Sequence, residues 1–136
     1  MNKLITLLVC CCCGIASADD VYSVFGDTFP IVQAHQVMIY RHLYVACLDI
    51  EAKQPAWVAY RVKRSDWDTN NVLDRNFSTP KDMRDICLEP SDYRKSPYQM
   101  GHLYGLQFVS ARNDANEVNQ MCVISAQRAD LNTGPW

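Results

Sequence analysis

Three apolar runs, separated by polar segments, predict three β-strands. They cover residues 37–48, 57–62 and 118–126. The first two runs are rich in β-branched and aromatic residues with partial alternation, so we expect one buried and one solvated face on each. A polar connection containing Pro55 is typical of a hairpin between them. The third run is almost continuously apolar, which favours a central position in the sheet.

The remaining segments are polar and favour loops and short turns. Residues 65–97 contain three prolines and no sustained helical or strand period, which predicts long surface loops with a turn or two. Residues 101–108 predict a short strand or turn, and residues 110–116 a loop or one helical turn. Asp130 or Asn132 could cap a helix, and Pro135 would be tolerated in the first turn of that helix.

The first eighteen residues predict an export signal that is not part of the fold. Lys3 precedes an apolar run over residues 4–13, and Ala-Ser-Ala at 16–18 resembles a cleavage site. The run is shorter than the roughly 18 to 20 residues that span a bilayer, so no membrane association is expected after cleavage. We therefore expect one secreted or periplasmic domain over residues 19–136.

Charge and cysteine content limit the possible classes of protein. The net charge of −2 argues against nucleic-acid binding by bulk charge alone, although basic and acidic residues alternate through the middle of the chain. Cleavage would leave Cys47, Cys87 and Cys122, for which one disulfide and one free thiol is the simplest arrangement in an oxidising compartment. All three pairings remain open. The chain past residue 18 has no CxxC spacing, so a zinc site is not expected.

Three residues could carry chemistry. His102 follows Gly101, whose lack of a side chain would let a substrate backbone approach, and an imidazole can take a proton from water near neutral pH. The amide oxygen of Asn132 could bind Mg²⁺, which prefers oxygen ligands and keeps several waters. Arg75 could stabilise extra negative charge on a phosphate. Taken singly, each has an ordinary explanation: a partly buried histidine, a helix cap and a surface arginine.

Taken in order, four segments resemble the DNA/RNA non-specific endonucleases, a secreted family with a ββα-metal (His-Me finger) core. Residues 98–103 look like the family's Asp-Arg-Gly-His signature. Residues 124–136 are similar to its Asn-Ile-x-Pro-Gln and Leu-Asn-x-Gly-x-Trp block. Residues 55–60 are similar to its Trp-Val-Ala-Tyr strand, and residues 75–77 to its Arg-Asn-aromatic triplet. The resemblance covers roughly residues 40–136.

The resemblance implies an α+β fold, in which a small antiparallel sheet carries the ββα-metal core. The His102 strand and a helix starting at Asn132 would face one another across the edge of the sheet. His102 would be the general base, Arg75 would stabilise the transition state, and Asn132 would hold Mg²⁺, with Mn²⁺ as a possible substitute. Asn119 and Gln127 would support the site. The expected activity is hydrolysis of DNA and/or RNA through the phosphate backbone, with little sequence preference.

The chain also departs from the family pattern. Gln99 and Met100 replace the acid and the cation of the signature, and Val123 and Ala126 replace an Asn and a Pro. The family continues past the position of Trp136 with a long helix, so we expect this domain to be shorter than its relatives. The alternative interpretation is a non-catalytic, nuclease-like remnant that acts as a secreted nucleic-acid-binding or interaction module.

Overall fold

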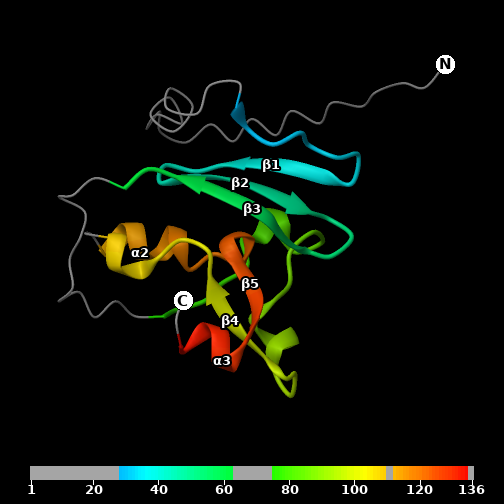
Figure 1. The fold of residues 1–136 in the computed structure, drawn as a ribbon. Coiled ribbons are helices and arrows are strands. Elements are labelled where there is room, and N and C mark those ends of the chain that lie inside the picture. Colours follow the sequence, from blue (N-terminus) through cyan, green and yellow to red (C-terminus); the bar gives the residue numbers. More distant parts are fainter. Residues whose placement is uncertain (1–27, 63–74, 110–111, 135–136) are drawn as a thin grey trace.

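Two antiparallel sheets organise the part of the chain that the structure, a computed structural model, describes: residues 28–62, 75–109 and 112–134 (Figure 1). The first sheet has the order β1-β2-β3 and consists of β1 (Gln36–Tyr40), β2 (Tyr44–Asp49) and β3 (Gln54–Tyr60). The second sheet pairs β4 (Tyr98–His102) with β5 (Ile124–Arg128). Together with the helices, these sheets confirm the predicted α+β class.

The helices are short. The α-helices are α2 (Arg112–Val118) and α3 (Ala129–Asn132), and the 3₁₀ helices are η3 (Lys81–Met83), η4 (Pro90–Tyr93), η5 (Leu106–Phe108) and η6 (Met121–Val123). Helix α3 directly follows β5 and contacts both β4 and β5, so these three elements form a ββα unit below the three-stranded sheet in Figure 1. None of the helices in the described ranges is long and apolar enough to cross a membrane. The predicted export signal lies outside those ranges.

The first predicted strand is two strands. The chain turns between Tyr40 and Tyr44, where the amide of Arg41 donates to the carbonyl of Tyr44 at 2.9 Å. The amide of Leu43 donates to Oε1 of Glu117 at 2.9 Å. The side chain of Arg41 donates to Oε1 of Gln120 at 3.1 Å. Glu117 and Gln120 are more than 70 residues away in sequence. Glu117 satisfies a backbone amide that a continuous strand would have paired elsewhere, and Gln120 holds the side chain of Arg41.

The hairpin between β2 and β3 forms in the predicted segment, but its connection is shorter than predicted. Its turn precedes Gln54, and Oδ1 of Asp49 accepts hydrogen bonds from the amides of Glu51 and Ala52 at 3.0 and 2.9 Å. Pro55 lies inside β3, beside an irregularity in the pairing with β2. Proline is tolerated there because β3 is an edge strand in this sheet.

The prediction of one central strand over residues 118–126 is wrong. Val118 ends α2, residues 121–123 form η6, and only the last part of the run enters β5, which pairs with β4 and not with the first sheet. The run is continuously apolar because its helical turns are buried: Val118, Met121 and Val123 are each at most 1% exposed. A short apolar run cannot by itself distinguish a buried strand from buried helical turns.

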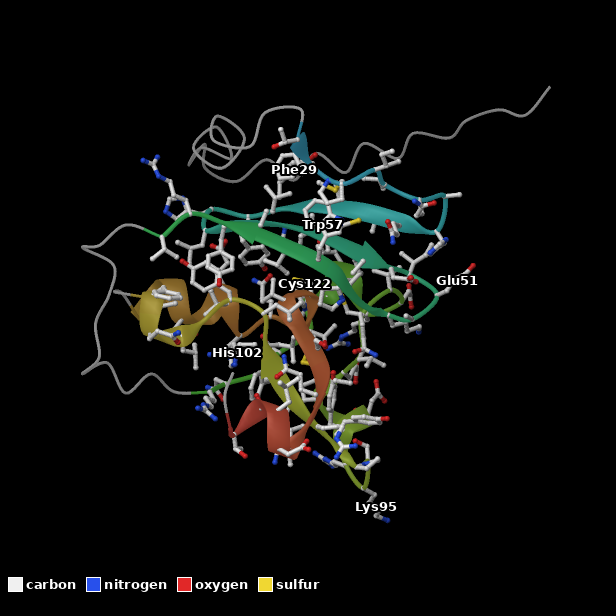
Figure 2. All side chains as sticks on the ribbon, in the orientation of Figure 1. Phe29, Glu51, Trp57, Lys95, His102 and Cys122 are labelled. Atoms are coloured by element: carbon white, nitrogen blue, oxygen red, sulfur yellow. The ribbon has the colours of Figure 1, made fainter. Side chains whose placement is uncertain are left out.

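The core forms under β2, which is buried on both faces. Tyr44, Ala46 and Leu48 belong to the main apolar cluster, together with residues of α2 and η6. On the other face Phe29 stacks on Trp57, with ring centroids 5.6 Å apart (Figure 2). The expectation that this strand would have one solvated face is therefore wrong.

The predicted disulfide does not form, since Cys47, Cys87 and Cys122 are all free, buried thiols. Cys47 lies opposite Trp57 in the sheet, whereas Cys87 and Cys122 belong to the main cluster. Successive side chains of a strand point to opposite faces, so β2 separates Cys47 from the other two thiols. The thiol of Cys122 lies 3.3 Å from the hydroxyl of Tyr44.

Candidate active site

His102 ends strand β4 (Figure 2). Three contacts fix it there. It lies opposite Ile124 in the β4–β5 ladder, and Ile124 is only 1% exposed. Its Nε2 atom lies 2.9 Å from Oδ1 of Asn119. Its ring packs at an angle on Phe77, with centroids 5.1 Å apart. The imidazole is therefore held by strand pairing, a hydrogen bond and a ring contact.

Asn119 is a fully buried polar residue, and its backbone is held on both sides. Its amide donates to the carbonyl of Ala115, and its carbonyl accepts from the amide of Ser78. The apolar run predicts Asn119 at the start of a strand, but it lies in the turn just after α2. Because Oδ1 can only accept, Nε2 of His102 carries the hydrogen, and in the neutral ring Nδ1 is then the basic nitrogen.

The surroundings keep the imidazole neutral. Burial lowers the pKa of His102 below its usual value of 6.5, and the positive charge of Arg75 lowers it further. The hydrogen bond with Asn119 opposes this shift in the pKa. A neutral imidazole at neutral pH is the form that can accept a proton.

A pocket of about 220 Å³ brings together His102 and Arg75, which lie 27 residues apart in the chain. The pocket is lined by the end of β3, by Arg75, by the end of β4 and by the segment around η5. The lining residues are Tyr60, Arg75, His102, Leu103, Gly105, Leu106, Gln107 and Phe108. Tyr60 and Phe77 occur in sequence blocks that resemble the family, although no role followed from them. Nothing in the sequence indicated Phe108.

Asn132 is the last residue of α3, so the prediction that it begins a helix is wrong. The helix starts earlier, at Ala129, because the chain turns directly out of β5. The Nδ2 atom of Asn132 donates to Oε1 of Gln99 at 3.0 Å. The structure thus ties Asn132 to the strand that carries His102, but Asn132 does not line the pocket of His102 and Arg75.

Gln127 explains why residue 101 is a glycine. It is 6% exposed, lies opposite Gln99, and packs its side chain over Gly101. A Cβ atom at residue 101 would lie 2.6 Å from Cγ of Gln127 and closer still to Cδ and Oε1. Gly101 therefore makes room for Gln127, and not for a substrate backbone as the sequence suggests. Oε1 of Gln127 is buried and accepts no hydrogen bond from the described residues.

Near α3, the structure offers one amide oxygen that could bind a hard cation. No group of three or more His, Cys, Asp or Glu residues within the described ranges could hold a metal ion. The hydrogen bond with Gln99 uses Nδ2 of Asn132, which leaves the amide oxygen of Asn132 as an oxygen donor. Mg²⁺ can bind through one or two protein oxygens while waters and substrate phosphates fill its remaining positions.

Comparison with known proteins identifies the family of this chain. Residues 23–136 match the family model described as DNA/RNA non-specific endonuclease. A protein named Nuclease from Serratia marcescens is 28% identical over 149 aligned residues, which cover 99% of this chain and 53% of the relative. The chain thus spans about half the length of that curated relative. Because the family model extends over the ββα unit and the whole pocket, this chain belongs to the DNA/RNA non-specific endonuclease family.

Proposed function

We propose that this chain is an exported, Mg²⁺-dependent endonuclease that hydrolyses phosphodiester bonds of DNA and/or RNA. One observation carries the proposal: a neutral His102, fixed by Asn119, lines the same pocket as Arg75. A base and a cation side by side are what attack by water on an anionic phosphodiester requires. The predicted leader supports a secreted or periplasmic location.

In the proposed reaction, His102 activates water. Nδ1 takes a proton as the water oxygen forms its bond to phosphorus. The bond from phosphorus to the leaving sugar oxygen breaks, and that oxygen takes a proton from solvent. Asn119 keeps the hydrogen on Nε2, so Nδ1 is the unprotonated nitrogen of the neutral ring. A base placed in this way contributes about 10²- to 10⁴-fold in rate.

Arg75 and Asn132 have different roles in the proposal. The guanidinium of Arg75 would pair with the non-bridging phosphate oxygens and stabilise the charge that builds up on them. The amide oxygen of Asn132 would hold Mg²⁺ or Mn²⁺, and Gln99 would orient that amide. When bound, the ion would polarise the scissile phosphate. Contacts to phosphate carry no sequence information, so we expect cleavage with little sequence preference.

A second candidate function is a secreted nucleic-acid-binding module that does not cleave. The observation in its favour is that Asn132 lies against Gln99 and outside the pocket of His102 and Arg75. The replacement of the family's acid and cation by Gln99 and Met100 points in the same direction.

The two candidates differ in an assay on plasmid DNA and on RNA. For the endonuclease, we expect the purified chain to degrade them with Mg²⁺ or Mn²⁺ but not with EDTA, and His102→Ala to lose activity. His35→Ala is a matched control, because His35 pairs with Asp49 at 3.2 Å outside the pocket. Salt-sensitive binding without cleavage in either metal would favour the second candidate. Intact nucleic acid and no binding would overturn both.

A further inference from the structure

The pocket of His102 and Arg75 has an aromatic wall that phosphodiester chemistry does not use. Tyr60, Leu106 and Phe108 line the same space as the base and the cation. Leu106 and Phe108 have no polar group for proton transfer or charge stabilisation, and the ring of Tyr60 adds an aromatic face beside them. Their position points to a part of the substrate beyond the phosphate.

The wall is built on a rigid support. The ring of Tyr60 packs on that of Tyr104, with centroids 4.3 Å apart, and Tyr104 is only 3% exposed. The ring centroids of Phe108 and Tyr60 lie 6.4 Å apart, and the two ring planes make an angle of 39°. Tyr60 and Phe108 are half-buried, in contrast to Tyr104, and both reach the pocket. Aromatic rings held in this way offer contact area at little cost in side-chain entropy.

We infer that this wall stacks on the nucleobase next to the phosphate that Arg75 contacts, so that the site takes single-stranded nucleic acid in preference to duplex. The inference rests on the proposed function. A nucleotide combines an anionic phosphate with a flat aromatic base, and the pocket combines a guanidinium with aromatic side chains. In a duplex, neighbouring bases cover both faces of each base, and extruding one costs unstacking and unpairing. In a single strand those faces are available.

The size and polarity of the pocket limit what it can select. Its volume of about 220 Å³ is below the roughly 300 to 1,000 Å³ of ordinary small-molecule sites, which suits one base and not a run of bases. The exposed Gln107 also lines the pocket. Its amide can both donate and accept hydrogen bonds, so it can meet the edge of any base. The wall therefore selects strandedness and not sequence.

Equilibrium binding tests this directly. A short single-stranded DNA with one 2-aminopurine is titrated with the native chain in EDTA and low salt, and compared with its duplex and with the same strand carrying an abasic residue at that position. We expect quenching of the 2-aminopurine on binding. We also expect the base-bearing strand to bind about fivefold to one-hundredfold more tightly than the abasic strand, as one base–aromatic stack provides.

Two substitutions at residue 108 form a matched pair. Phe108→Leu keeps an apolar side chain but removes the ring, so it should abolish most of the preference for single strands. Phe108→Tyr keeps the ring and should retain that preference. Thermal unfolding of both variants shows whether the fold is kept. The comparison of base-bearing and abasic strands on the native chain does not depend on any substitution.

The outcomes separate this inference from the proposed function. Equal affinity of the native chain for base-bearing, abasic and duplex DNA would overturn the inference, as would the lack of measurable binding to any of them. Cleavage with Mg²⁺ is measured on the same three DNAs. A chain that cleaves them all at equal rates keeps the proposed function and loses the inference. If the chain binds the base-bearing strand preferentially but cleaves none of the three DNAs, the inference stands and the proposed endonuclease function is overturned.

Discussion

Replacing Gly101 by alanine tests the packing that supports His102. The new Cβ atom would overlap the side chain of Gln127, whose Cγ would be only 2.6 Å away. Gln127 is only 6% exposed and packs over Gly101, so its side chain cannot move aside into solvent. The substitution therefore forces a shift of Gln127 or of strand β4, one residue before the imidazole.

The expected loss of stability follows from two opposing effects. Overpacking a well-packed interior costs about 1 to 3 kcal/mol. Replacing glycine by alanine returns about 0.4 to 1 kcal/mol by restricting the unfolded chain. The net change for Gly101→Ala is then a loss of about 0 to 2.6 kcal/mol in the free energy of unfolding, centred on about 1.3 kcal/mol. With a urea slope of about 1.5 kcal/mol/M, a loss near the middle of this range lowers the midpoint by about 1 M.

Urea unfolding followed by circular dichroism measures this effect. Gly105→Ala is the control, because the atoms nearest to a Cβ atom there belong to the flexible end of the exposed Gln107 side chain, with Nε2 at 2.8 Å. That variant should stay within about 0.5 kcal/mol of the native chain. Combining Gly101→Ala with Gln127→Ala removes the overlap and should restore most of the loss, as a double-mutant cycle would show. An unchanged midpoint for Gly101→Ala, or no rescue in the double variant, would refute the reasoning.

Three further predictions concern charge and thiols. Since burial lowers the pKa of His102 in the folded chain, the unfolded chain binds a proton at this residue more readily. The contribution of His102 to stability should therefore be complete well above pH 6.5 and decline as the pH falls through that value. His102→Gln should remove this contribution from the pH dependence of urea unfolding. Arg75→Gln should raise the pKa of His102, measured by NMR titration, and lower the cleavage rate by about 10²- to 10³-fold. Arg84→Gln is the control and should change neither, because Arg84 is an exposed arginine paired with Glu89 at 3.8 Å. If the pKa of His102 stays the same in Arg75→Gln, the pocket geometry is contradicted. The three buried cysteines should react with a thiol reagent only after unfolding and should then give three thiols for a chain starting at Asp19; a count of one would mean a disulfide.

Much of the candidate site can be predicted from short sequence blocks. The Gly-His step, the Arg-Asn-Phe triplet and the Leu-Asn-Thr-Gly block are enough to indicate His102, Arg75 and Asn132 as functional candidates. Such blocks are readable because chemistry needs particular residue types at particular spacings. The α+β class follows from the resemblance of these blocks to the family, whereas strands β2 and β3 follow from local apolar patterns.

Other features depend on partners far along the chain. The turn after Tyr40 is stabilised by Glu117 and Gln120, and the orientation of the His102 ring is set by Asn119 from a turn after α2. The identity of these contacts depends on how the segments pack, which no local pattern contains.

The sequence by itself determined which residues are chemically able to act, because composition and spacing are properties of the linear chain. Only the tertiary structure decided that His102 and Arg75 share a pocket with an aromatic wall, that Asn132 ends a helix against Gln99, and that Gly101 makes room for Gln127. Each of these depends on distances between side chains from different elements. Such distances are fixed when buried apolar surface and paired backbone groups bring those elements together in one arrangement.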